Sequence, residues 1–276
     1  MCPSSSAAIC AGATTTVAAA PLMLMSDRRP LRSRRLPICP TRNGSAMRQC
    51  LLCDVGALCL AHGHEQRVHD MHLHVIHGGP YPAGATLFHE GDPMSALLVV
   101  RSGTVKLVVG APSGEEQILG FAMPGDVIGL DAIHAERHGC SARVLEAASL
   151  CRLPLATVMR LAETVPGLQR SLLDLLSRQL DRTTRLLIGR YEAEQRLAAF
   201  LMLLSRHARR RGLPAQRLHL GMPRTDIANY LRLTPETISR TFRHLQSRRL
   251  IDVSRRDLQL LDLTALHQIG GALLPG

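Results

Sequence analysis

Three cysteines, Cys50, Cys53 and Cys59, stand close together in a C-x2-C-x5-C spacing. A C-x2-C turn directs two sulfurs towards one centre, and thiolates are strong ligands for zinc and for iron–sulfur clusters. Packing alone does not explain three thiols at this spacing. His62 follows Cys59 by three residues, so a Cys3His zinc site is one way to complete the ligand set. The sequence therefore predicts a metal centre, and the spacing leaves its fourth ligand open.

The composition limits the class of protein that carries this centre. A chain of 276 residues with 46% hydrophobic residues can form two small domains and a tail. It is too long to need a disulfide framework, so its eight cysteines indicate metal or redox chemistry in an intracellular, cytoplasmic protein. No apolar run approaches the roughly 18 residues of a spanning helix, and we expect no membrane partner. The net charge of +11 indicates a polyanionic partner, most simply nucleic acid.

The segments before the first strands have distinct compositions. Residues 1–46 are rich in serine, alanine and arginine and are expected to be a disordered basic tail. Residues 47–80 hold the cysteine cluster and a histidine-rich stretch, which we expect to be a solvated, partly helical linker. Its histidines are His62, His64, His69, His72, His74 and His77. Metal binding by these histidines is the less favoured alternative.

Short apolar strands separated by glycine turns follow in residues 81–164. Their regular spacing predicts an antiparallel β-roll, or jelly roll. The expected strands cover residues 85–88, 97–100, 104–109, 118–121 and 127–128, with turns at Gly91, Gly103, Gly114 and Gly125. A short helix over 155–163 closes this part of the chain.

A long helix is predicted over residues 165–191. Its apolar positions step by three and four residues, as in a coiled-coil seam, while the opposite face is rich in arginine. We therefore expect two copies of the chain to form a homodimer along this helix. The seam consists of Leu173, Leu176, Leu180, Thr183 and Leu187. Packing of the same stripe on the chain's own β-roll is the alternative.

Residues 192–276 have the pattern of a winged helix-turn-helix. After a helix over 192–210, a helix at 222–231 is followed by a turn and a second helix at 234–245, where Thr234 suits the N-cap and Pro235 the first helical position. Strands at 250–253 and 258–261 form the wing. The overall fold class is α+β, with a sensor roll, a dimerisation helix and a DNA-binding domain.

The second helix of this motif presents side chains that suit double-stranded DNA. Glu236 can accept from cytosine, Arg240 can bond bidentately to guanine, and Ser239 is a short base contact. Three further residues, Arg224, Thr225 and Arg243, are expected to contact phosphates.

These motifs together resemble the CRP/FNR superfamily of bacterial transcription regulators, and among them the oxygen-responsive FNR branch. The resemblance covers about residues 47–270. Its most specific stretches are Asn229–Leu231, Leu233–Thr234, Glu236–Arg240 and Arg196–Phe200, with Arg101–Thr104 and Ile128–Ile133 in the roll. It implies an anaerobic regulator, an activator by the same analogy, that binds palindromes of TTGAT half-sites as a homodimer and contacts RNA polymerase through the loop around Gly114.

The resemblance also implies a [4Fe–4S] cluster held by Cys50, Cys53, Cys59 and a fourth cysteine from the roll. By motif the fourth is Cys151, with Cys140 as the rival. It further implies that Asp181, beside the seam, repels its counterpart when the cluster is absent. Zinc, with His62 as a ligand, is the alternative cofactor, and the chain is then a constitutive regulator.

Other functions of the superfamily fit the sequence less well. Cyclic-nucleotide binders carry glutamate after a glycine that matches Gly129, and arginine at the position of Cys140; here Leu130 follows the glycine. A cyclic phosphate would then lack charge-assisted bonds. A haem- or small-molecule-responsive regulator is a further alternative. No set of nucleophile, base and orienting residue is visible, so we expect no enzyme.

Overall fold

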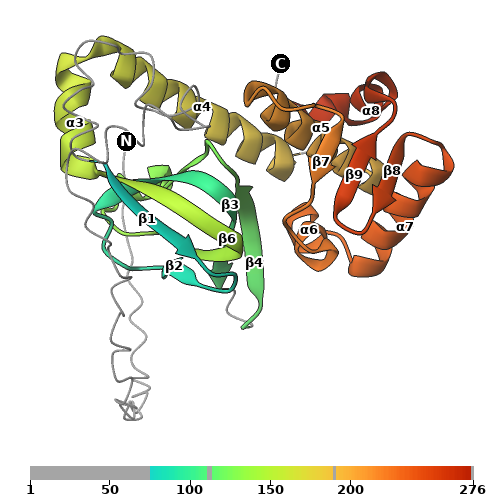
Figure 1. Cartoon of the computed structure of the whole chain (residues 1–276), viewed down its shortest axis with the longest axis horizontal. Helices are drawn as coiled ribbons and strands as arrows, with labels where there is room; N and C mark the ends of the chain where they lie inside the picture. The colour runs from blue at the N-terminus through green and yellow to red at the C-terminus, as the bar shows by residue number, and fades with distance from the viewer. Residues whose placement is uncertain (1–74, 111–113, 189–190, 275–276) are drawn as a thin grey trace, which may run out of the picture. The chain divides into compact units, whose positions relative to one another are not determined.

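The computed structural model describes residues 75–110, 114–188 and 191–274, all of which belong to one compact unit of the chain. The described part begins with a β-roll and ends with a helical domain that includes a small sheet (Figure 1). This is the α+β architecture that the sequence predicts. Among the described residues, no helix is both long enough and apolar enough to cross a membrane.

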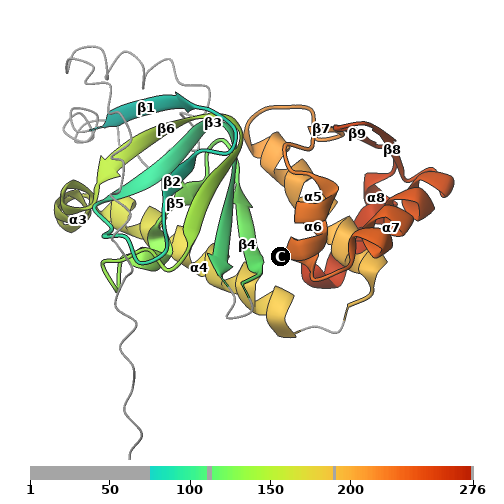
Figure 2. The same cartoon turned by 90° about the horizontal axis from the view of Figure 1, so that it is seen from below.

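The β-roll is one six-stranded antiparallel sheet. Its strands are β1 (Ile76–Tyr81), β2 (Thr86–Phe88), β3 (Ala96–Gly110), β4 (Glu116–Ala122), β5 (Val127–Ile128) and β6 (Ser141–Pro154), with a 3-10 turn at Leu130–Ala132. The main path is β1-β6-β3-β4, while β2 pairs with β6 and β5 with β3 (Figures 1 and 2). The long strands β3 and β6 therefore connect the β1 edge with the β4 edge.

Strand β3 differs from the sequence-based expectation. Two strands separated by a turn at Gly103 were expected, but one strand continues through that glycine, with shifts in its pairing to β6 between Val100 and Val105. Gly103 has φ of +80°, and a Cβ there would meet the backbone of Ala147. Glycine inside a strand often marks a bulge or a close backbone approach. The turn signal in the sequence therefore marks a bend within one strand.

The end of the histidine-rich segment is also corrected by the structure. A solvated, partly helical linker was expected up to residue 80, but β1 begins at Ile76 and pairs with the last strand of the roll. His77 is only 7% exposed. Strand pairing on one side and the roll's core on the other account for this burial. The remaining histidines named above, His62 to His74, lie outside the described residues.

Helices α3 (Leu155–Thr164) and α4 (Pro166–Ile188) follow the roll without a long connection. One side of α4 packs on the roll, where Leu168 is buried and Leu172 and Leu175 are partly buried against the same core. Its other side points away, and Leu173, Leu176 and Leu180 are 61%, 39% and 69% exposed. The stripe therefore does not pack on the chain's own roll at these three positions. The side chains of Thr183 and Leu187 are not among those that the structure describes.

The C-terminal domain combines four helices with a three-stranded sheet. The helices are α5 (Ala193–Arg210), α6 (Arg224–Leu231), α7 (Pro235–Ser247) and α8 (Leu263–Gly270), followed by a 3-10 turn at Gly271–Leu273. The strands are β7 (Arg217–His219), β8 (Ile251–Ser254) and β9 (Asp257–Leu260), in the order β7-β9-β8. The sequence reading identified the β8–β9 wing but neither β7 nor α8.

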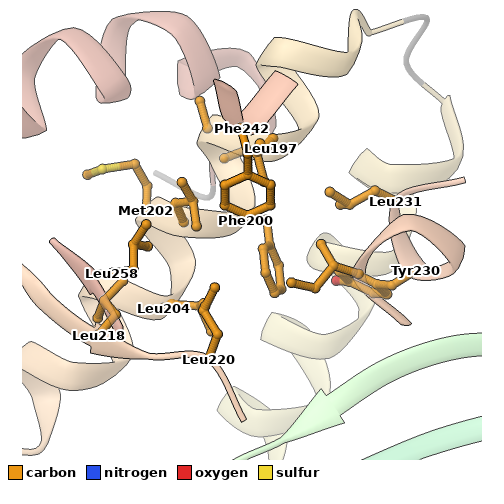
Figure 3. Close-up of a cluster of buried hydrophobic side chains, with 14 of the residues drawn as sticks. Leu197, Phe200, Met202, Leu204, Leu218, Leu220, Tyr230, Leu231, Phe242 and Leu258 are labelled. Atoms are coloured by element: carbon orange, nitrogen blue, oxygen red, sulfur yellow. The ribbon is translucent and has the colours of Figure 1, made fainter. Parts of the chain in front are cut away.

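The core of this domain is built around α5 (Figure 3). Leu197, Phe200, Leu231 and Phe242 point towards one another, and all are buried. The helix ends follow the sequence signals. The Thr234 hydroxyl accepts a hydrogen bond from the Thr237 amide, and Pro235 occupies the first turn of α7. These features fix the start of the helix that presents Glu236.

Candidate functional sites

Cys151 lies near the C-terminal end of β6, with its side chain in the apolar core that the roll shares with α3 and α4. Its thiol is outside any disulfide and is 5% exposed. On one side it pairs with Val99 of β3 and on the other with His77 of β1. The His77 Nδ1 atom is 3.2 Å from the Cys151 sulfur, and Arg101 Nη1 is 3.4 Å from the same nitrogen. The sulfur therefore has a basic neighbour inside an otherwise apolar environment.

The apolar residues around Cys151 join the roll to the helices that follow it. They form one core with Val158 and Leu161 of α3 and Leu168 of α4. A change at this sulfur is therefore close to the residues that hold the first turns of α4. Such packed cores transmit small displacements because they contain few voids.

Cys140 occupies a different environment. It belongs to the other core of the roll and is 2% exposed, with its sulfur 4.0 Å from Asp131 Oδ2. Burial, together with the nearby carboxylates of Asp131 and Glu90, raises the pKa of the Cys140 thiol to about 12. A metal ligand must be the thiolate, so these surroundings disfavour ligation by Cys140.

The other cysteines of the expected ligand set, Cys50, Cys53 and Cys59, lie outside the described residues, as does His62. Within the described ranges no group of three or more His, Cys, Asp or Glu side chains could hold a metal ion. Of the four proposed cluster ligands, Cys151 is thus the one whose surroundings the structure describes. A ring nitrogen beside a cysteine sulfur can serve as the hydrogen-bonding neighbour of a thiolate ligand.

Helix α7 exposes the residues expected to face DNA. Glu236, Arg240 and Arg243 are exposed and Ser239 is half-buried, while Ile238, Phe242 and Leu245 on the opposite face are buried. The spacing of these positions places the polar set along one face of the helix. Side chains on such a face can enter the major groove without disturbing the domain core.

The basic residues around α7 have different surroundings. Thr225, at the start of α6, is exposed. The Arg224 guanidinium lies 4.6 Å from the Phe242 ring centroid, which orients it at the start of the same helix. Two further arginines of this domain have acidic partners, since Arg248 pairs with Glu194 and Arg256 lies 3.1 Å from Glu146.

The DNA-binding domain also contacts the β4 edge of the roll through Asn229 of α6. The Asn229 Oδ1 accepts from the Ile118 amide at 2.7 Å, and its Nδ2 donates to the Glu116 carbonyl at 2.8 Å. Gln117 adds a donor to the same oxygen at 3.1 Å. The Asn229 side chain thereby bonds backbone N–H and C=O groups at the edge of β4, as a neighbouring strand would.

Aromatic and charged residues surround this contact. Tyr230 packs edge-on against Phe121 of β4, with ring centroids 5.4 Å apart, and Phe200 lies beside both rings. The Lys106 ammonium is 3.2 Å from the Asp226 carboxylate, an ion pair without an aligned hydrogen bond. One continuous core therefore runs from β3 and β4 into α5 and α6.

Histidines complete the same interface. His219 of β7 lies between Glu146 of β6 at 2.9 Å and Asp257 at 3.1 Å. Hydrogen bonds to these two carboxylates raise the pKa of His219, and the bond to Glu146 has the larger effect. His207 of α5 contacts the Pro124 carbonyl at 2.9 Å. Burial is the main cause that lowers the pKa of His207, although Asp126 opposes it.

Comparisons with known proteins agree with this two-part architecture. Residues 79–165 match the model of the cyclic nucleotide-binding domain, and residues 195–269 match that of the Crp-like helix-turn-helix domain. The chain is 36% identical over 230 residues to the transcriptional activator protein anr of Pseudomonas aeruginosa, covering 82% of this chain and 94% of that protein. The chain belongs to the CRP/FNR family of transcription regulators. The resemblance inferred from its motifs is confirmed.

Other members of the CRP/FNR family are similar along most of the chain. The fumarate and nitrate reduction regulatory protein of Escherichia coli is 34% identical over 233 residues, covering 83% of this chain and 93% of that one. The solved structure of FixK2 from Bradyrhizobium japonicum superposes with a TM-score of 0.62 at 26% identity, covering 71% of this chain and 96% of that chain. The Pseudomonas and Escherichia relatives are a transcriptional activator and a regulatory protein, so the expectation that the chain is no enzyme is confirmed.

Two features of this CRP/FNR regulator escaped the sequence reading. His77 looked like one of several linker histidines, and no local signal places it beside a residue 74 positions away. Asn229 stood out as part of a family motif, but its bonds to β4 depend on how two domains meet.

Proposed function

We propose that the chain senses oxygen through a [4Fe–4S] cluster and controls anaerobic gene expression as a DNA-binding dimer. Cys50, Cys53, Cys59 and Cys151 are the proposed ligands. The observation that carries this proposal is the position of the Cys151 thiol, which is buried beside a ring nitrogen and within the core that includes the start of α4. Similarity to the fumarate and nitrate reduction regulatory protein supports it. When bound, such a cluster supplies a ligand-bridging centre that oxygen degrades.

The protein residues explain how ligation reaches the dimer helix. Cys151 is fixed in β6, so ligation by Cys50, Cys53 and Cys59 ties the N-terminal segment to the roll. The side chains next to Cys151 include Leu168 of α4. We infer that this tether favours the position of α4 in which the two copies of the chain associate. A local zinc site with His62 lacks this connection to the roll.

The proposed dimer uses the exposed side of α4. Leu173, Leu176 and Leu180 have no apolar cover in the described chain, and Thr183 and Leu187 continue the same spacing. Asp181 stands beside the seam, where charge repulsion between copies is proposed to weaken association of cluster-free protein. An apolar seam on a 23-residue helix suits a two-stranded coiled coil.

The proposed dimer presents two α7 helices to a palindrome of TTGAT half-sites. Glu236, Ser239 and Arg240 are the proposed base contacts. Arg243, Arg224 and Thr225 are proposed to contact phosphates and thus to contribute affinity without specificity. RNA polymerase is proposed to bind the loop that includes Gly114 and Glu115. We also propose that the protein is cytoplasmic, because DNA and RNA polymerase are found there. The domain boundaries predicted from the sequence remain a prediction.

Anaerobic reconstitution with iron and sulfide tests this function most simply. We expect brown protein that contains about four irons and four sulfides per chain, as a [4Fe–4S] site requires. The visible spectrum should bleach in air. Tightly bound zinc without sulfide would instead indicate a constitutive regulator with a structural metal. A Glu236→Ala variant should lose discrimination at one base pair by about 1–3 kcal/mol, whereas Arg243→Ala should weaken binding to all sequences alike.

A further inference from the structure

The Cys151 sulfur has a polar neighbour to which no motif assigns a role. His77 lies directly opposite Cys151 in the pairing of β1 with β6, and its Nδ1 atom is 3.2 Å from the sulfur. Both side chains are buried, at 7% and 5% exposure. A buried imidazole in an apolar core is costly unless its nitrogens are bonded. The contact with Cys151 is one of the bonds that keep this ring in place.

The chemistry of the contact depends on the state of the sulfur. A thiol donates its proton to an unprotonated ring nitrogen, whereas a ligated thiolate only accepts. A neutral imidazole can carry its proton on Nδ1 and then donate to such a thiolate. Hydrogen bonds to ligand sulfurs are among the factors that set the reduction potentials of iron–sulfur clusters.

Arg101 adds a positive charge at the same place. Its Nη1 is 3.4 Å from His77 Nδ1. A guanidinium only donates, so Nδ1 cannot accept from Arg101 and donate to the sulfur at the same time. With a thiolate at Cys151, the ring proton faces the sulfur and Arg101 contributes charge rather than a bond to Nδ1.

We propose that His77 is a positioning residue for the fourth cluster ligand, and that its Nδ1–H donates a hydrogen bond to the Cys151 sulfur. This inference rests on the proposed function, because it requires Cys151 to be a ligand. The bond removes electron density from the sulfur and favours the more reduced state of the cluster. Loss of the bond therefore lowers the reduction potential and makes the cluster easier to oxidise.

Three substitutions separate hydrogen bonding from packing. His77→Asn places an amide nitrogen close to the former Nδ1 position and retains a donor. His77→Leu fills a similar volume but cannot donate. His134→Asn, an exposed histidine elsewhere in the roll, is the matched control. Thermal unfolding of each variant without the cluster shows whether the roll still folds.

The experiment measures the midpoint potential of the reconstituted cluster and the rate at which its visible absorbance is lost in air. We expect the His77→Leu cluster to have a lower potential and to decay about tenfold faster than wild type, a typical effect of losing an outer hydrogen bond. The His77→Asn cluster should decay at close to the wild-type rate, and His134→Asn should not differ from wild type.

The possible outcomes distinguish the two proposals. If wild-type protein forms no cluster, the proposed function itself fails. If wild type forms a cluster but His77→Leu has the same potential and decay rate, the positioning role is wrong. If His77→Asn and His77→Leu decay equally fast, the effect comes from packing and the hydrogen bond is again excluded.

Discussion

The two edges of the β-roll differ in how they contact the rest of the chain. At the β1 edge, a single buried sulfur and one histidine stand in an apolar core shared with α3 and α4. At the β4 edge, hydrogen bonds of Asn229 and aromatic packing among Phe121, Tyr230 and Phe200 join the roll to the DNA-binding domain. A change at the first edge therefore affects one residue pair. At the second edge, many weak contacts together stabilise the association of the roll with the DNA-binding domain.

We infer from this difference that the β1 edge serves the proposed sensing and the β4 edge serves the coupling to the DNA-binding domain. Strands β6 and β3 lie between the two edges, and β6 carries both Cys151 and Glu146, which pairs with His219. A single substitution of Cys151, near the β1 edge, should abolish the proposed cluster binding. A single substitution at the β4 edge should weaken the contact only in part. The predictions below test this contrast from the largest expected effect to the smallest.

The largest effect is expected at Cys151. Cys151→Ala should bind no stable cluster under anaerobic reconstitution, because three thiolates leave one iron without its protein ligand. Cys140→Ala should retain the full iron and sulfide content, since that thiol is buried beside two carboxylates. Iron and sulfide analysis checks both variants. Loss of the cluster in Cys140→Ala but not in Cys151→Ala would reverse the assignment.

The exposed side of α4 should give the next largest effect. Leu180→Glu places a charge in the proposed seam, where burial without a partner costs roughly 3 kcal/mol or more. Dimer dissociation should rise at least about a hundredfold in sedimentation equilibrium. Leu119→Glu, at a leucine on β4 that is also half-exposed, is the control and should leave the dimer unchanged. Equal association of both variants would exclude α4 as the interface.

Asn229→Ala should have an intermediate effect. It removes the partners of the Ile118 amide and the Glu116 carbonyl, which should lower the free energy of unfolding by about 1–3 kcal/mol. Asn229→Asp keeps the acceptor but loses the donor. Thr225→Ala, exposed on the same helix, is the control for helix propensity. Urea unfolding checks these values, and a change below about 0.5 kcal/mol would show that the β4 contact contributes little.

Much of the DNA-binding domain follows from local sequence. Thr234, Pro235 and the buried positions of α7 form a pattern within one helix, so no distant contact is needed to predict it. The β1 edge is different, because the pairing of His77 with Cys151 joins residues 74 positions apart. Gly103 is a third case, because a glycine is compatible both with a turn between two strands and with a bend within one strand. Only the pairing of β3 with β6 shows that the strand continues.

The smallest effect concerns pH where His219 of the DNA-binding domain meets Glu146 of β6. The pKa of His219 is raised by Glu146 and Asp257, so its contribution is present below the ordinary histidine pKa and is lost as pH rises through the folded value. Since His219 is half-exposed, this contribution should stay below about 1 kcal/mol. Arg256 also bonds Glu146 and limits it further.

Unfolding of wild type and His219→Gln between pH 5 and pH 9 measures this contribution. The difference between the two should be largest at low pH and should vanish at high pH. His207 has the opposite sign, because burial lowers its pKa and its neutral form is favoured; stability from this group declines as pH falls below the ordinary histidine range. A pH-independent difference at His219 would contradict the ion-pair account.

The most direct test of the central claim is the DNA affinity of wild type and Cys151→Ala, each measured without oxygen and again after exposure to air. For a palindrome of TTGAT half-sites, we expect wild-type affinity to fall by about 5- to 150-fold in air, the usual range of coupling between two sites. Cys151→Ala should bind weakly under both conditions. Equal wild-type affinity before and after air, with an intact cluster at the start and a bleached one at the end, would contradict the account.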